Sequence, residues 1–209
     1  MGNRYYNKGK KQYIPSVTTV LGIISKPFSI QWANKIGLEG TEYRKYMKEV
    51  CDIGSLMHHL IECNLKDEEP DYFKYTGIEK ALPLLDEFLK WKEEHEIKVI
   101  FTEHKMVCDE YGGTCDLYCE CDGVKTLIDY KTSKSIYPEH GFQLSAYKNL
   151  LALEGHEVEK CVILSIARET GVLKVKEFYN LEEEFEIFES ALKLFSLKKK
   201  YEKGKKWLI

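Results

Sequence analysis

The sequence has no apolar run that approaches the length needed to cross a membrane. Its first thirteen residues, MGNRYYNKGKKQY, are polar and basic and lack the apolar core of a secretory signal. Internal repeats, low-complexity tracts and Gly/Ser linkers are also missing from the 209 residues. We therefore expect a cytoplasmic, non-secreted protein with no membrane partner, folded as a single domain over residues 1–209.

Cysteine occurs seven times, an odd number, and no targeting segment directs the chain to an oxidising compartment. Free thiols are therefore expected. The net charge of −3 gives no global sign of a nucleic-acid partner. The two ends are more basic, because residues 1–13 hold four cations and no acid, and SLKKKYEKGKKWLI holds six lysines against Glu202. Such ends are usually solvated, and local binding of phosphates is the alternative.

Helical patterns fill residues 15–95 and predict a mainly helical N-terminal part. Ser16 is a candidate N-cap for a short helix over VTTVLGIIS, which Pro27 should stop. Pro83 is tolerable only in the first turn of a helix, which limits where the last of these helices begins. The other expected helices cover Ile30–Ile36 with a resumption after Gly40, GSLMHHLIECNL from about Asp52, and a segment with Leu82, Leu85, Phe88, Leu89 and Trp91 at helical spacing.

Strand patterns replace the helical ones between residues 97 and 179. Three of them, IKVIFTEHKMV, GTCDLYCEC and VKTLIDYKT, form a meander, and a helix over about Glu139–Leu153 separates them from CVILSIAR and VLKVKEFY. An amphipathic helix and a basic tail follow over residues 181–209. This order predicts an α/β (α+β) fold, with a mixed central β-sheet flanked by helices and an N-terminal helical elaboration.

A hairpin in the middle of this sheet raises a question of charge. Asp122-Gly123 is a strong signal for a two-residue type I′ turn, which needs positive φ at both central residues. With that turn Cys121 faces Val124, and counting back along both strands puts Asp116 opposite Asp129. Their Cβ atoms would then lie about 5 Å apart, where like charges destabilise the pair.

Alternation places Lys131 on the face of Asp116 and Asp129, and the cysteines of the hairpin on the other face, which we expect to be core. Two explanations of the paired acids stay open. The face is solvated and lysines relieve the repulsion, or a divalent cation lies between the carboxylates, as in sites that hydrolyse phosphate esters. In the second case divalent ions should raise the melting temperature, and Asp116→Asn should stabilise the metal-free protein.

Other parts of the chain offer partners for the two acids. His58 lies one helical turn after Gly54, and Glu62 follows one turn later on the same helix face. His59 is a built-in comparison, because a lone helix histidine is usually structural or exposed. Glu103, in the strand before the hairpin, is a further candidate ligand, although a surface glutamate is the more ordinary interpretation.

Four motifs together are more specific than any one of them. They are Gly54-x-x-x-His58, Gly113-x-x-Asp116, Asp129-Tyr130-Lys131-Thr132-Ser133 and Gln143-x-x-x-Tyr147. Taken in this order, they resemble the nuclease domain of RecB-type exonucleases, members of the PD-(D/E)XK superfamily with its restriction-endonuclease-like core. The segment IPSVTTVL and nearby Trp32 also resemble the start of the mitochondrial genome maintenance exonuclease group and related phage nucleases.

The resemblance implies a role for each matching residue. His58, Asp116 and Asp129 would be metal ligands, with the main-chain carbonyl of Tyr130 a further one. Lys131 would orient or activate the attacking water and steady the charge on the phosphate. The residues that would organise the site or contact DNA are Gln143, Tyr147, Ser16 and Thr132, and Glu103 and Glu62 have no secure counterpart in the family.

Some relatives in this family hold an iron–sulfur cluster through one early cysteine and three late ones. Here the last cysteine is Cys161, alone, and Cys115, Cys119 and Cys121 suit packing better than ligation. We therefore expect neither an iron–sulfur cluster nor a zinc site. The expected cofactor is Mg²⁺ or Mn²⁺, as one or two ions.

The predicted activity is that of a metal-dependent DNA exonuclease that prefers single-stranded ends or tails. The alternatives are a structure-specific or single-strand endonuclease at the same site, and a nucleic-acid-binding recombination module that has lost catalysis. Replication or recombination proteins are candidate partners, in a bacterial or phage-infected cell, with roles in DNA repair, recombination or phage DNA processing. The sequence does not indicate an oligomeric state.

Overall fold

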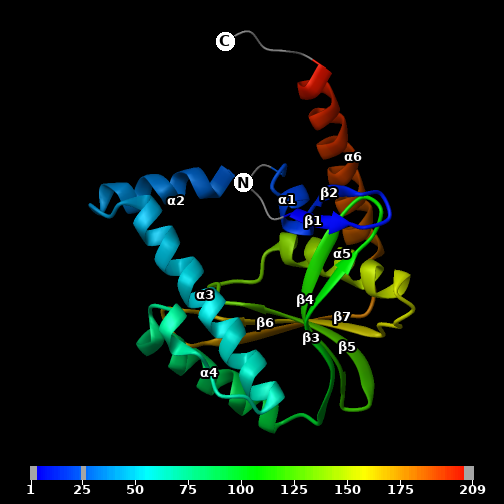
Figure 1. The fold of residues 1–209 in the computed structure, drawn as a ribbon. Coiled ribbons are helices and arrows are strands. Elements are labelled where there is room, and N and C mark those ends of the chain that lie inside the picture. Colours follow the sequence, from blue (N-terminus) through cyan, green and yellow to red (C-terminus); the bar gives the residue numbers. More distant parts are fainter. Residues whose placement is uncertain (1–3, 25–26, 205–209) are drawn as a thin grey trace.

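The computed structural model describes residues 4–24 and 27–204. Its centre is a five-stranded sheet in the order β3-β4-β5-β6-β7, in which only β5 and β6 run parallel (Figure 1). The predicted mixed sheet flanked by helices is therefore confirmed. The strands are β3 (Ile97–Val107), β4 (Gly112–Cys121), β5 (Val124–Lys131), β6 (Lys160–Ile166) and β7 (Leu173–Phe178).

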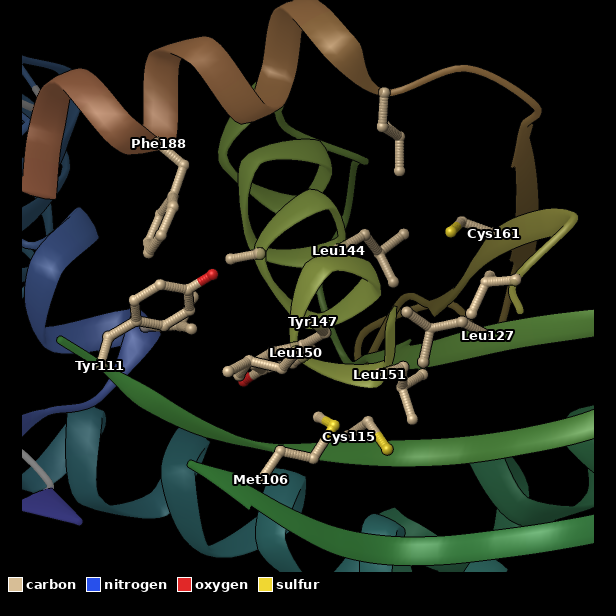
Figure 2. Close-up of a cluster of buried hydrophobic side chains, with 14 of the residues drawn as sticks. Met106, Tyr111, Cys115, Leu127, Leu144, Tyr147, Leu150, Leu151, Cys161 and Phe188 are labelled. Carbon is tan, nitrogen blue, oxygen red and sulfur yellow. The ribbon is translucent and has the colours of Figure 1, made fainter. Parts of the chain in front are cut away.

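Helices cover both faces of the sheet. On one face, α3 (Tyr43–Lys66) and α4 (Ile78–Glu93) pack on a cluster that includes Leu117, Cys119 and Ile128. On the other, α1 (Val17–Leu21), α5 (Pro138–Leu153) and α6 (Glu182–Gly204) pack on a cluster that includes Leu127 and Cys161 (Figure 2). The hairpin is thus buried on both faces, and no solvated face relieves the charges of its acids.

Cys115 lies on the opposite face of the sheet from the face predicted for it. Cys115 packs with α5 and α6, whereas Cys119 and Cys121 pack with α3 and α4. The regular alternation of β4 is therefore broken between Cys115 and Leu117, at Asp116. Among the described residues all seven cysteines are free, as the sequence predicted.

The hairpin turn is the predicted one, with φ of 52° at Asp122 and 81° at Gly123. The strands pair in the predicted register from Cys121–Val124 to Leu117–Ile128. The paired register ends there, one pair short of Asp116 and Asp129. Beyond that pair, the carboxylate Oδ2 of Asp116 accepts the backbone N–H of Tyr130 at 2.8 Å. A side-chain hydrogen bond therefore replaces the backbone hydrogen bonds between the two strands.

The N-terminal helices begin earlier than predicted. A helix α2 (Pro27–Leu38) begins before Ile30. The predicted resumption after Gly40 is confirmed, because α3 starts at Tyr43, and it continues without a break through Asp52. Pro83 lies well inside α4, so its predicted restriction to the first turn is wrong. The ring removes one N–H from the helix, and burial of Ala81, Leu84 and Phe88 holds the helix together across it. A short 3₁₀ helix, η1 (Tyr72–Lys74), joins α3 to α4.

The basic N-terminal segment is part of the fold from Arg4 onward. It forms an antiparallel hairpin, β1 (Arg4–Asn7) and β2 (Gln12–Pro15), which the sequence did not suggest. Asn7 donates to the carbonyl of Cys108 at 2.9 Å and so fixes the hairpin to the β3–β4 turn. Ser16 then caps α1, as predicted, by accepting the N–H of Thr19. The basic end SLKKKYEKGKKWLI lies in α6 as far as Gly204, and residues 205–209 lie outside the described residues.

Across the described ranges, no helix combines the length and the apolar character that a membrane span requires.

Candidate active site

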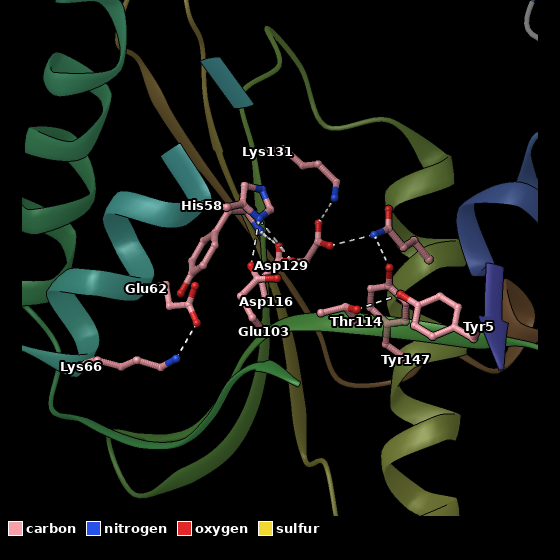
Figure 3. Close-up of polar contacts among 12 residues, drawn as sticks. Tyr5, His58, Glu62, Lys66, Glu103, Thr114, Asp116, Asp129, Lys131 and Tyr147 are labelled. Carbon is pink, nitrogen blue, oxygen red and sulfur yellow. Dashed lines mark hydrogen bonds and ion pairs between the residues drawn. The ribbon is translucent and has the colours of Figure 1, made fainter. Parts of the chain in front are cut away.

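A helix and two strands bring three ligand-type side chains together. His58 comes from α3, Glu103 from β3 and Asp116 from β4 (Figure 3). His58 Nδ1 lies 3.4 Å from Asp116 Oδ1 and 3.5 Å from Glu103 Oε1, and one ligand atom from each residue lies within 4.8 Å of the others. His58 and Asp116 therefore converge as predicted, and Glu103 joins them instead of lying on the surface.

Glu103 reaches this group through irregular backbone. The register of β3 against β4 shifts between Val99 and Phe101, and Glu103 itself has a φ of 48°. A glutamate rarely adopts this left-handed conformation, and such residues cluster at functional sites. No feature of the sequence marks the position, because IKVIFTEHKMV is an ordinary strand pattern.

The second acid is held from two sides. Asp129 is buried, its Oδ1 accepts from Gln143 Nε2 at 3.1 Å, and its Oδ2 forms an ion pair with Lys131. The Gln143 amide also donates to the Tyr147 hydroxyl at 2.9 Å. Gln143 and Tyr147, an i, i+4 pair on α5, thus fix Asp129. Asp129 is not one of the three residues of the ligand group. It is next to that group in the structure, because the N–H of the following residue, Tyr130, is donated to Asp116.

The acids of the site ionise differently. Burial opposes the charge on His58, but the carboxylates of Asp116 and Glu103 outweigh it and raise the pKa of His58 to about 10. Burial also opposes the charge on Asp116, yet the imidazolium of His58 holds the pKa of that carboxyl below its usual value. For Asp129, burial prevails over the attraction of Lys131, and Asp116 adds repulsion, so the pKa of Asp129 rises to about 6.

Because the pKa is raised at Asp129 and lowered at Asp116, we expect neutralisation of Asp129, and not of Asp116, to stabilise the metal-free protein. Asp129 binds its proton more tightly in the folded state, so it lowers stability as pH rises from about 4 to 6, and the cost is fully present above that window. Without metal, Asp129→Asn should therefore raise the melting temperature at pH 8 and change it little at pH 4.5. Thermal melts in EDTA test this, and an equal difference at both pH values would contradict it.

Two glycines of the motifs make room for side chains of the site. A Cβ on Gly113 would lie 2.4 Å from Cε1 of Tyr147, a separation that folded proteins do not show, so the tyrosine ring packs directly on the β4 backbone. A Cβ on Gly54 would meet Thr132 Oγ1 at 3.4 Å, which places the loop after β5 against α3. The glycines couple the histidine helix and the α5 helix to the acidic strands.

We expect Gly113→Ala to damage the site without removing any of its polar groups. The added methyl must displace Tyr147, which loosens Gln143 and with it Asp129. The variant should lose activity at least tenfold and be destabilised by about 1–3 kcal/mol, the usual cost of overpacking. Gly54→Ala is the matched control, since its methyl makes only an ordinary contact. Equal losses of activity and of melting temperature in the two variants would contradict this packing.

Several predicted residues have other contacts. Glu62 pairs with Lys66 at 2.5 Å and is not part of the ligand group. His59 accepts the N–H of Asp71 at 3.1 Å and stacks on Tyr75, a structural role. Ser16 is buried in its cap, and its contact with DNA stays a prediction, as does ligation by the Tyr130 carbonyl. Thr132 packs on Gly54, and its carbonyl oxygen accepts a hydrogen bond from the Arg168 guanidinium.

A second set of ligand-type residues, His95, Cys121 and Asp122, lies at the hairpin turn. His95 Nδ1 and Asp122 Oδ2 are 2.6 Å apart, and Asp122 Oδ1 accepts the N–H of Glu96 at 2.8 Å. These contacts close the turn on the end of α4. Burial raises the pKa of the Cys115, Cys119 and Cys161 thiols to about 12, which suits packing rather than ligation.

Comparison with known proteins leaves the family open. No family model matches the chain, and no curated protein matches it. Among solved structures it is similar to SSO0001, at 22% identity and a TM-score of 0.34 over 56% of this chain and 59% of that one. It is also similar to the alkaline exonuclease LHK-Exo from Laribacter hongkongensis, at 15% identity and a TM-score of 0.36 over 75% and 92% of the two chains.

The same alkaline exonuclease in complex with dAMP gives 14% identity and a TM-score of 0.40 over 74% of this chain and 86% of that one. Similarity at this level assigns neither family nor activity.

Proposed function

We propose that this chain is a divalent-metal-dependent nuclease that hydrolyses phosphodiester bonds of DNA, as an exonuclease preferring single-stranded ends or tails. The observation that carries the proposal is the convergence of His58, Glu103 and Asp116 beside the ion pair that buried Asp129 forms with Lys131. The resemblance of the four sequence motifs to RecB-type exonucleases supports the same activity and the same PD-(D/E)XK core.

The donor set fits a divalent ion. Two carboxylates and an imidazole, with one atom of each inside a 4.8 Å group, suit Mn²⁺ as well as Mg²⁺. Asp129 and the Tyr130 carbonyl would complete the ligands for one or two ions. Such an ion, when bound, polarises the phosphate and lowers the pKa of its water.

The other residues would act on the phosphate and on the ligands. Lys131 is 19% exposed, and Asp129 holds its ammonium, so the cation can orient the attacking water and balance charge on the phosphate. Gln143 and Tyr147 keep Asp129 in position. The Thr132 hydroxyl, which lies between Gly54 and Arg168, would contact the substrate backbone.

Two alternatives differ in the product or in the chemistry. A structure-specific or single-strand endonuclease would use the same residues on an internal bond. A nucleic-acid-binding module without catalysis would have no use for a lysine paired with a buried acid beside the ligand group, because burying the acid costs desolvation energy. The ion pair between Lys131 and Asp129 therefore favours an enzyme.

Labelled DNA tests the proposal. Single- and double-stranded oligonucleotides, labelled at the 5′ or the 3′ end, are incubated with Mg²⁺, Mn²⁺ or EDTA, beside a closed single-stranded circle and an RNA of the same sequence. We expect cleavage with metal and none in EDTA, with ladders from one end and an intact circle. Cutting of the circle would favour the endonuclease, and no cleavage with either metal would reject the proposed function.

A further inference from the structure

Two sets of residues in register across β5, β6 and β7 connect the site to β7, the edge strand of the central sheet. Lys131 on β5 is in register with Ser165 on β6, which is in register with Lys174 on β7. Asp129 is likewise linked through Ile163 to Lys176. Side chains of residues in register point to the same face of a sheet. Lys174 and Lys176 therefore lie on the face that carries Asp129 and Lys131.

A third lysine comes from the loop between β5 and α5. Lys174 Nζ donates to the carbonyl of Lys134 at 3.0 Å, which brings the loop to the β7 edge. The loop is fixed over β6, because Ser165 Oγ donates to the Ser133 carbonyl at 2.9 Å. The three lysines, 134, 174 and 176, are all exposed.

These cations are not neutralised within the part of the chain that the structure describes. Neither Lys134, Lys174 nor Lys176 has a carboxylate within 4.0 Å there, and Lys176 lies over the Phe178 ring at 4.7 Å. Lys160, on the next strand, is by contrast paired with Glu177 at 3.1 Å. Unpaired exposed cations next to a site that takes phosphodiesters attract phosphates.

We propose that Lys134, Lys174 and Lys176 form a path for the phosphate backbone of the substrate strand, from the site across β6 and over the β7 edge. This inference rests on the proposed function for the nature of the strand. Two strand spacings of about 4.8 Å separate Asp129 from β7. The path therefore reaches phosphates beyond the one at the cleaved bond, a few nucleotides along the strand.

Salt dependence of binding tests the path directly. Binding of a twenty-nucleotide oligo(dT) to the full chain is measured in EDTA, where no cleavage occurs, over a range of NaCl concentrations. Each phosphate contact contributes about 0.7 to the slope of log affinity against log salt for single strands. Lys174→Gln/Lys176→Gln should reduce the slope by about 1.4, and Lys174→Arg/Lys176→Arg should retain it.

Lys98→Gln/Lys125→Gln is the matched control, because it changes the net charge equally at the far end of the strands. An unchanged slope in the Lys174/Lys176 variant, or an equal loss in the control, would overturn the path. Lysines on edge strands also guard against pairing with another chain. A Lys174/Lys176 variant that self-associates, measured by sedimentation, yet binds DNA like the wild type would overturn it as well.

Cleavage distinguishes a failure of the path from a failure of the proposed function. Hydrolysis of a dinucleotide, whose single phosphodiester ends at the site, should be unchanged in Lys174→Gln/Lys176→Gln, whereas KM for the twenty-nucleotide strand should rise severalfold. A wild-type protein that cleaves neither substrate would reject the nuclease, while the salt slopes would still decide on the path. Equal kinetics of wild type and variant on the long strand would reject the path and leave the nuclease intact.

Discussion

Replacement of Lys131 or Asp129 by alanine should reduce DNA cleavage by at least about a hundredfold while leaving the protein folded. Lys131 would supply the cation nearest the reacting phosphate, and oriented charges of this kind contribute about 2.7–4 kcal/mol to a barrier, or 10²–10³ in rate. Loss of Asp129 also leaves the Lys131 ammonium and the Gln143 amide without their shared partner. Cleavage of end-labelled single-stranded DNA in Mn²⁺ measures the effect.

The two adjacent histidines supply the matched control for this experiment. His58 faces Asp116 and Glu103, whereas His59 faces Asp71 and Tyr75 on another side of α3. We expect His58→Ala to lose activity nearly as fully as Lys131→Ala. His59→Ala should keep most of its activity and lose only stability. Equal losses from both histidine variants, in proteins with similar melting temperatures, would mean that the site has been placed on the wrong face of α3.

Divalent ions should raise the melting temperature of the wild-type protein by several degrees. A ligand that binds only the folded state at 100 times its Kd adds about 2.7 kcal/mol, and 1 kcal/mol moves the melting temperature of a chain this size by roughly 2–4 °C. Ligation requires neutral imidazole, and the neighbouring acids raise the pKa of His58 to about 10. Metal binding therefore displaces a proton, and the shift should be larger at pH 8 than at pH 6.

Variants of two carboxylates show whether the response comes from this site. Asp116→Asn should abolish most of the metal-dependent shift, because Asp116 belongs to the ligand group. Glu62→Gln removes a carboxylate from the same helix as His58, but one paired with Lys66, and should keep the full shift. Scanning fluorimetry with millimolar Mn²⁺ measures both. The absence of a shift in the wild-type protein, or its persistence in Asp116→Asn, would contradict the assignment.

Asp116→Asn should also lower the stability of the metal-free protein, opposite to the expectation from the sequence. Strand counting revealed two acids in one hairpin, and repulsion between them seemed the dominant force. It could not reveal that His58 approaches Asp116 to 3.4 Å or that the Tyr130 N–H is donated to it. With those partners Asp116 is favoured as an anion, and the unfavourable charge belongs to Asp129.

The parts that the sequence predicted well are those set by local patterns. The Asp-Gly turn, the register of the hairpin, the Ser16 cap and the i, i+4 amide–phenol pair depend on few neighbouring residues. Other features depend on contacts between distant segments. The β1–β2 hairpin is held by Asn7 on Cys108, about a hundred residues away, and Pro83 is tolerated because the helix around it is buried.

Glu103 has a consequence for anyone who tries to improve this protein by selection. Its left-handed backbone costs about 1–3 kcal/mol, which glycine would recover. A library screened only for heat resistance would therefore favour Glu103→Gly, and every variant selected in this way would lack the carboxylate beside His58. At this position thermal stability and the ligand group favour different residues, so a screen has to select for stability and for activity together.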